Sequence, residues 1–219
     1  LKGTALDASF VLDAPAGKHG FVQRDGDSFV CVDDSGSKTP IKFFGTNIGG
    51  KGAFPDTHEE ADMLADSIAA AGFNLVRVHN IDGVSVPNVF DNADSGKKLS
   101  DKQMDKLCYL LSALKQRGIY YFLDQTVARK IYADDGTEDY DKIKSAKAVC
   151  YFDETLIGIL ENYSEMFLGY YNKYTGCKIG DDSALALIDL NNEDDLIPFD
   201  IRTLIGTHYY DDYKKLYNE

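Results

Sequence analysis

Ala184-Leu-Ala-Leu-Ile-Asp-Leu-Asn-Asn-Glu193 is a short apolar run that ends abruptly in two amides and a carboxylate. Its large apolar residues do not alternate with polar ones, as they would in a strand with one wet face, so we predict a strand buried on both faces. Such strands are typical of parallel sheets in α/β proteins, where ligand sites lie beyond the strand carboxyl ends. We therefore expect Asn192 and Glu193 to lie in a functional site.

Similar units precede this run along the chain. Each combines a strand with an amphipathic helix that opens on a capping residue and stops at a glycine. Helices are predicted to begin at Thr57, Ser100 and Asp153 and to end at Gly72, Gly118 and Gly176, and strands are predicted at 41–47, 73–79 and 119–124. A fourth helix is expected to begin near Thr203. The sequence thus predicts four β/α units.

Polar residues close every predicted strand. Asn47 ends the first, Arg77 and His79 the second, Asp124 the third and Glu193 the fourth. A doubly wound sheet and an eight-stranded barrel both consist of alternating strands and helices. A doubly wound sheet concentrates ligand binding at one point, whereas a barrel places polar residues at the carboxyl ends of several strands, so the polar ends of all four strands favour the barrel.

A (β/α)8 barrel needs eight strands and typically about 250 residues. We therefore predict that residues 41–219 form the first half of such a barrel, which would be incomplete, with the rest missing or supplied by a second chain. No helix stop follows Leu216, and the chain does not begin with Met, which suggests an excised product. Residues 1–40, with short apolar pairs between turn-forming residues, are predicted to form an antiparallel flap before the barrel.

The composition narrows the function classes. The chain has 219 residues, 44% of them hydrophobic, and a net charge of -13. That charge would repel nucleic acid and anionic membrane surfaces, so neither is expected as a partner, and no run is long enough to span a bilayer. The four cysteines lack a C-x-x-C spacing and are expected to be free thiols.

The sequence has no complete motif for a nucleotide site or a metal site. The glycine-rich segment 48–52 lacks both the Walker spacing and the Gly-x-Gly-x-x-Gly pattern, which favours a plain turn. His79 and Asp82 could begin a metal site, but no His-x-His follows the first predicted strand. No metal or cofactor is expected. The charged segment 128–150 has no clear period and is predicted to be a long loop over the strand carboxyl ends.

A carboxylic acid after an amide at a strand end suits glycoside hydrolysis. One carboxyl group protonates the leaving oxygen, and a second attacks the sugar or activates water. Glu193 would be the proton donor, and Asn192 would bond a sugar hydroxyl. The alternative is that residues 191–195 form a polar turn that satisfies its own backbone.

Several motifs, in order along the chain, resemble the clan A glycoside hydrolases, in particular a cellulase-like group close to family 5. They are Ala16-Gly-Lys-His-Gly-Phe-Val22, Phe44-Gly-Thr-Asn47, Phe54-Pro55, Val76-Arg-Val-His79, Arg117-Gly-Ile-Tyr120, Leu123-Asp124, Ala128-Arg-Lys130 and Asn191-Asn-Glu193. The resemblance implies a retaining β-glycosidase in which Glu193 is the acid/base, Asn192 the substrate amide and Arg77 the arginine that steadies the nucleophile.

The resemblance also implies a sugar site lined by His79, with Asn47 and Asp124 at neighbouring strand ends. Asp124 is expected either to touch the substrate or to bond Arg77 or Arg129. Where many clan members carry a substrate-binding histidine after the third strand, this chain has Gln125 and Thr126.

The nucleophile of the family lies on the seventh strand, outside these residues. We therefore expect the chain alone to be inactive. A β-linked polysaccharide or oligosaccharide is the expected substrate, and secretion follows from the resemblance alone. The competing hypothesis is a non-catalytic carbohydrate-binding or scaffolding barrel.

Overall fold

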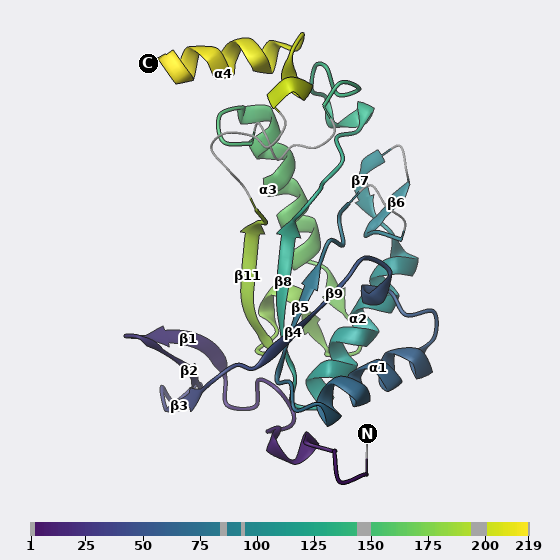
Figure 1. Cartoon of the computed structure of the whole chain (residues 1–219), viewed down its shortest axis with the longest axis vertical. Helices are drawn as coiled ribbons and strands as arrows, with labels where there is room; N and C mark the ends of the chain where they lie inside the picture. Colours follow the sequence, from purple (N-terminus) through teal and green to yellow (C-terminus); the bar gives the residue numbers. More distant parts are fainter. Residues whose placement is uncertain (1–2, 84–86, 93–94, 144–149, 194–200, 219) are drawn as a thin grey trace.

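The computed structural model describes residues 3–83, 87–92, 95–143, 150–193 and 201–218. Its centre is a parallel sheet of four strands in the order β11-β8-β5-β4 (Figure 1). These strands are β4 (Gly45–Gly49), β5 (Leu75–His79), β8 (Tyr120–Thr126) and β11 (Leu185–Asn191). Strands that follow one another among these four are neighbours in the sheet, as expected for successive β/α units wound in one direction.

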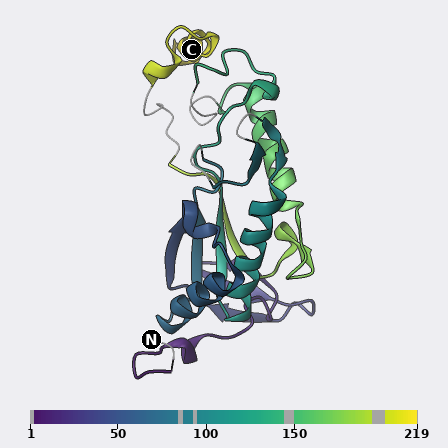
Figure 2. The same ribbon diagram turned by 90° about the vertical axis from the view of Figure 1, so that its right-hand side faces the viewer.

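Three helices alternate with these strands: α1 (His58–Ala70), α2 (Asp101–Gln116) and α3 (Glu154–Leu168). Each begins at a predicted N-cap, because the side chains of Thr57, Ser100 and Asp153 accept hydrogen bonds from backbone amides of the first turn. α2 and α3 lie along the same side of the sheet (Figure 2). The prediction of alternating β/α units with a parallel sheet is confirmed.

The two faces of the sheet differ in what covers them. In β5, Val76 and Val78 are buried, whereas Arg77 and His79 are only partly buried. Because side chains alternate along a strand, Val76 and Val78 face the helices and join the main hydrophobic core, while Arg77 and His79 point to the opposite face. That second face would line the interior of a barrel.

Smaller elements surround the central sheet. A three-stranded antiparallel sheet comprises β1 (Phe21–Asp25), β2 (Ser28–Val32) and β3 (Lys38–Ile41). Two short hairpins pair β6 (Phe90–Asn92) with β7 (Ser95–Leu99), and β9 (Tyr171–Asn172) with β10 (Cys177–Lys178). Short 3-10 turns occur at Ser9–Val11, Gly50–Ala53, Ala133–Asp135, Ile179–Asp181 and Ile201–Leu204.

Three predicted boundaries are wrong. The last helix was expected to begin near Thr203, but residues Ile201–Leu204 form a 3-10 turn and the helix begins at His208. The first strand was expected at 41–47, but Ile41 pairs with Phe29 in the antiparallel sheet and the parallel strand runs from Gly45 to Gly49. The third helix was expected to reach Gly176, but it ends at Leu168, where Gly169 is the C-cap, and the hairpin of β9 and β10 follows.

The last helix, α4 (His208–Asn218), lies apart from the strand that precedes it (Figure 1). Its Tyr209 packs in a second hydrophobic cluster with Leu204 and with Leu156 at the start of α3. Because α4 does not cover β11, Leu190 remains 67% exposed and Ile188 is also exposed. The prediction that β11 is buried on both faces is therefore wrong for this chain.

No helix among the described residues has the length and apolar content needed to cross a bilayer. All four cysteines lie within the described residues, and no disulfide joins any of them, as predicted.

Candidate active site

Arg77 is the centre of a polar network at the carboxyl edge of the sheet. It stands on β5 opposite Phe122 of β8, and its guanidinium group lies over that ring, 5.4 Å from the centroid. Its Nε donates to Asp124 at 2.9 Å, and its terminal nitrogen Nη2 donates to Asp189 and Asn192 on or just after β11. One side chain therefore ties three neighbouring strands together at the level where they end.

Asp124 is the buried acceptor of this network, with 0% of its side chain exposed. One carboxylate oxygen accepts from Arg77 Nε, and the other lies 2.7 Å from a terminal nitrogen of Arg77 and 2.5 Å from His79 Nδ1. The bond to Asp124 is the main cause that raises the pKa of Arg77 above its ordinary value. Of the two partners expected for Asp124, the structure selects Arg77, because Arg129 pairs with Asp135 instead.

Asn192 is buried and anchored on both sides. Its backbone amide donates to Thr126 on the neighbouring strand at 2.9 Å, and its side-chain oxygen accepts from Arg77 at 2.6 Å. Because an arginine can only donate, the oxygen of the amide must face Arg77. The amide NH2 group of Asn192 then points elsewhere and makes no hydrogen bond to a described residue.

Asp189 is a member of the network that the sequence analysis missed. It lies opposite Asp124 in the register of β11 and β8, accepts from Arg77 at 3.3 Å and keeps 30% of its side chain exposed. The available signal was a single carboxylate within an apolar run. A charge in the middle of a strand must reach a partner or water, so Asp189 marked the face that is not packed on helices.

Glu193 follows Asn192 but stays outside the network. Its backbone has a φ of 52°, in the left-handed region that few residues other than glycine adopt, and its side chain is exposed. No hydrogen bond or ion pair joins it to another described residue. Asn47 lies on β4 beside Arg77 in the register; it too is exposed and has no bonded partner in the described part of the chain.

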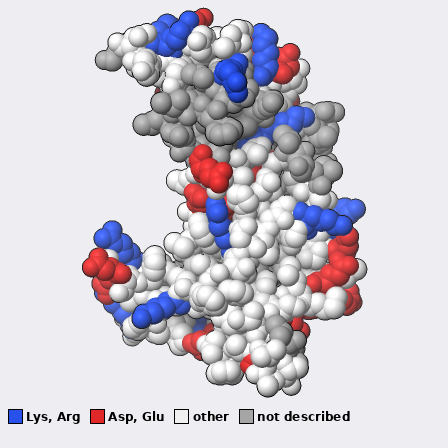
Figure 3. Space-filling model, viewed as in Figure 1, with Lys and Arg blue, Asp and Glu red and all other residues white. Residues whose placement is uncertain are grey.

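Of the six predicted site residues, the structure thus joins Arg77, His79, Asp124 and Asn192 by hydrogen bonds and leaves Asn47 and Glu193 at the rim. Figure 3 shows acidic and basic side chains side by side on this face, near the ends of the central strands.

Gln125 and Thr126, which stand where many clan members have a substrate-binding histidine, point to opposite faces of the sheet. Gln125 is buried and accepts from Ser164 of α3 at 3.0 Å, so its side chain points toward the helices. Thr126 shares the face of Asp124 and is also buried. Only Thr126 of the two lies on the side of the polar network.

The loop after β8 is fastened by buried charges. Asp82 is fully buried and accepts from the backbone amides of Val127 and Ala128, and burial raises its pKa to about 6. Arg129 is equally buried, pairs with Asp135 at 3.1 Å and lies over the ring of Phe90. Asp82 therefore supports the loop and does not combine with His79, and no metal-binding group occurs among the described residues.

Comparison with known proteins supports the fold. No protein-family model and no curated protein sequence matches the chain. Among solved structures, an endo-1,4-beta-mannanase from Rhizomucor miehei superposes with a TM-score of 0.58 at 20% identity, over 80% of this chain and 48% of the mannanase. A glycoside hydrolase family 5 mannosidase from the same organism gives a TM-score of 0.57 at 15% identity, over 82% of this chain and 50% of the mannosidase.

The chain thus spans about half the length of the structures that it matches. Its fold is that of part of a (β/α)8 barrel, with four parallel strands in sequence order, as in the family 5 glycoside hydrolase that it matches and as the resemblance implied.

Proposed function

We propose that this chain is the N-terminal half of a retaining glycoside hydrolase that acts on β-linked polysaccharide or oligosaccharide, with Glu193 as its acid/base. One observation carries the proposal: the 2.6 Å bond from Arg77 fixes Asn192 at the carboxyl edge of a family-5-like half-barrel. Active sites of barrels are built at this edge. The residue directly after Asn192 is Glu193, which is exposed to an incoming ligand.

In the proposed reaction, the carboxylic acid of Glu193 donates a proton to the glycosidic oxygen as the bond to the sugar breaks. Its carboxylate then accepts a proton from the water that releases the sugar from the enzyme. Asn192, whose oxygen is engaged by Arg77, donates from its NH2 group to a sugar hydroxyl next to the reacting carbon. His79 and Asn47 stand on the same face and are proposed to contact the sugar, while Asp124 holds Arg77 and His79 in place.

A retaining mechanism requires a second carboxyl group about 5–5.5 Å from the first. Asp189 and Asp124 are both committed to Arg77, so neither suits a nucleophile. We infer that the nucleophilic glutamate comes from outside these residues, on the remaining half of the barrel or on a second chain. The 219 residues alone are then expected to be inactive, and the complete enzyme is proposed to be secreted.

Glu193→Gln in the complete gene product tests the assignment. Both reported neighbours are named for mannose-containing substrates, so β-1,4-mannan is the first substrate to try, followed by β-1,4-glucan. Loss of proton donation should lower kcat/KM on the polysaccharide by about 10²–10⁴-fold, and much less on an aryl β-glycoside whose leaving group needs no proton. Glu161→Gln, an exposed glutamate on α3, is the matched control. An unchanged rate on the polysaccharide would remove Glu193 from the mechanism.

One observation favours the alternative, a non-catalytic carbohydrate-binding or scaffolding barrel. Glu193 has no described partner to orient it, whereas Asn192 and Arg77 are joined by a hydrogen bond of 2.6 Å. If the complete protein binds β-glycans and hydrolyses none of them, and Asn192→Ala abolishes that binding, the alternative is correct.

A further inference from the structure

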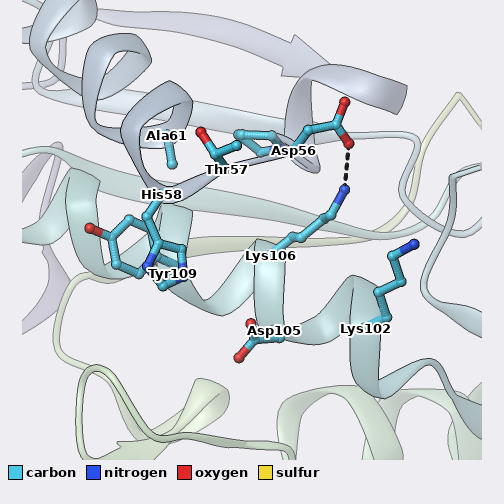
Figure 4. A pocket seen from close by; sticks show the side chains of 9 residues that line it. Asp56, Thr57, His58, Ala61, Lys102, Asp105, Lys106 and Tyr109 are labelled. Atoms are coloured by element: carbon cyan, nitrogen blue, oxygen red, sulfur yellow. Dashed lines mark hydrogen bonds and ion pairs between the residues drawn. The ribbon is translucent and has the colours of Figure 1, made fainter.

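A second polar and aromatic site lies on the outer layer of helices, away from the carboxyl edge of the sheet. Two cavities of about 180 and 390 Å³ share Lys102 and Asp105 of α2. The smaller opens between the start of α1 and the outer face of α2 (Figure 4). The larger lies between α2 and the residues around β9, and its volume falls in the range of about 300–1,000 Å³ that is usual for small-molecule sites.

Aromatic rings form the walls of this outer site. His58 stacks on Tyr109 with ring centroids 3.6 Å apart and planes nearly parallel, and Tyr174 stands edge-on to both rings. Tyr170 and Tyr171 line the larger cavity, and Tyr171 is 60% exposed. An exposed tyrosine beside a cavity presents a flat apolar face and a hydroxyl group to a ligand.

The charges of the outer site are balanced. Three carboxylates line the two cavities, and each is within reach of a lysine: Asp56 with Lys106 at 2.6 Å, Asp105 with Lys173 at 2.7 Å and Asp101 with Lys98 at 3.2 Å. Three lysines also line the cavities, namely Lys102, Lys106 and Lys173. On a chain with a net charge of -13, this local neutrality disfavours both a cation and an anion as the ligand.

The site still offers many hydrogen-bonding groups. The Asp105 carboxylate accepts from Tyr174 Oη at 3.0 Å as well as from Lys173, and Lys173 lies over the Tyr174 ring. Carboxylates and ammonium groups fixed in this way can accept from and donate to hydroxyl groups without a change in net charge. Flat apolar faces beside neutral hydrogen-bonding pairs match a sugar ring, which has apolar C–H faces and hydroxyls around its edge.

We propose that this outer site binds a neutral glycan through pyranose rings stacked on its tyrosines. The outer site is separate from the proposed catalytic residues, because its residues lie on or just before α1, on α2, and in or just before the β9–β10 hairpin. None of them belongs to the Arg77 network. Such a site would hold a polysaccharide on the protein surface without cleaving it.

The test is isothermal titration of the 219-residue chain with mannohexaose, cellohexaose and, as an α-linked control, maltohexaose. Tyr171→Ala removes the most exposed ring and should weaken binding of the β-linked hexaose by at least about tenfold. Tyr217→Ala on α4, also an exposed tyrosine at 76%, is the matched control and should have no effect. Asn192→Ala removes the amide proposed to bind sugar at the carboxyl edge, so binding that persists in this variant is assigned to the outer site.

A second variant distinguishes the loss of a ligand contact from local unfolding of the β9–β10 hairpin in Tyr171→Ala. Lys102→Ala lies on the exposed face of α2, where alanine preserves the helix, and it should also weaken binding while the far-ultraviolet circular dichroism stays the same. Failure of all three hexaoses to bind, or binding that Asn192→Ala abolishes and Tyr171→Ala does not change, would overturn the proposal. Hydrolysis by the complete protein depends on Glu193 and is tested separately, so the two proposals can fail independently.

Discussion

Asp124→Asn should be among the most destabilising polar substitutions in the chain. The variant removes the negative charge from a side chain that is 0% exposed and that binds both Arg77 and His79. Breaking a buried ion pair by removing one partner costs about 3–5 kcal/mol. The Arg77 side chain is 32% exposed, so water replaces part of the lost interaction, and we reduce the expected loss in free energy of unfolding to about 2–4 kcal/mol.

Urea unfolding of the 219-residue chain, followed by circular dichroism and tyrosine fluorescence, measures this loss. Asp189→Asn is the matched control, because Asp189 accepts from the same arginine at 3.3 Å but is 30% exposed, and it should cost less than about 1 kcal/mol. A double-mutant cycle with Arg77→Met should give a coupling energy of about 1–3 kcal/mol between Arg77 and Asp124. Equal losses for the two aspartates, or a coupling near zero, would refute the idea that Asp124 holds Arg77 in place.

Three further outcomes follow from the described contacts. Burial raises the pKa of Asp82 from 3.8 to about 6, so between these pH values the folded chain retains a proton that the unfolded chain has released. The free energy of unfolding should therefore fall by roughly 2 kcal/mol as the pH rises from about 4 to about 6, and Asp82→Asn should flatten that slope in urea titrations at several pH values. Arg129→Met removes the guanidinium partner of the buried Asp135 carboxylate, which keeps the backbone amide of Tyr132 as a donor, and should cost about 3–5 kcal/mol in urea unfolding. Asp135→Asn in the same chain should restore much of this loss. Asp153→Ala removes the N-cap of α3 and should lower the melting temperature by an amount equivalent to about 1 kcal/mol, while Glu154→Ala, one position later, should have a smaller effect.

Sequence patterns predicted the helix starts well because the decisive interactions are local. The side chains of Thr57, Ser100 and Asp153 each bond an amide three residues further on, so neither the sheet nor the core needs to be known. The end of α3 was missed because the local pattern was misleading there. Tyr171 continues a helical spacing, but Gly169 had already ended the helix, and Gly176 belongs to the turn between β9 and β10.

The sequence predicted which residues meet in the candidate site, but not which of them bond to one another. Polar residues at the carboxyl ends of parallel strands meet at one edge, which is enough to bring Arg77, Asp124 and Asn192 together. Whether Asp124 would bind Arg77 or Arg129 depends on where the loop after β8 runs, and that loop is fixed by Asp82, 45 residues earlier. Such long-range contacts leave no periodic signal in the sequence. The exposure of Leu190 was equally unpredictable, because it depends on α4 packing over α3 and away from β11.

The two outer strands of the central sheet, β4 and β11, favour self-association of the chain in solution. β4 and β11 each pair with a described strand on one side only, so each presents a row of backbone N–H and C=O groups on the other. Beside β11, Ile188 and Leu190 add an exposed apolar strip. A net charge of -13 keeps copies apart at low ionic strength, and salt screens that repulsion over about 10 Å at 0.1 M. Light scattering of the isolated chain should therefore detect self-association that increases with salt, the opposite of an interaction held by ion pairs.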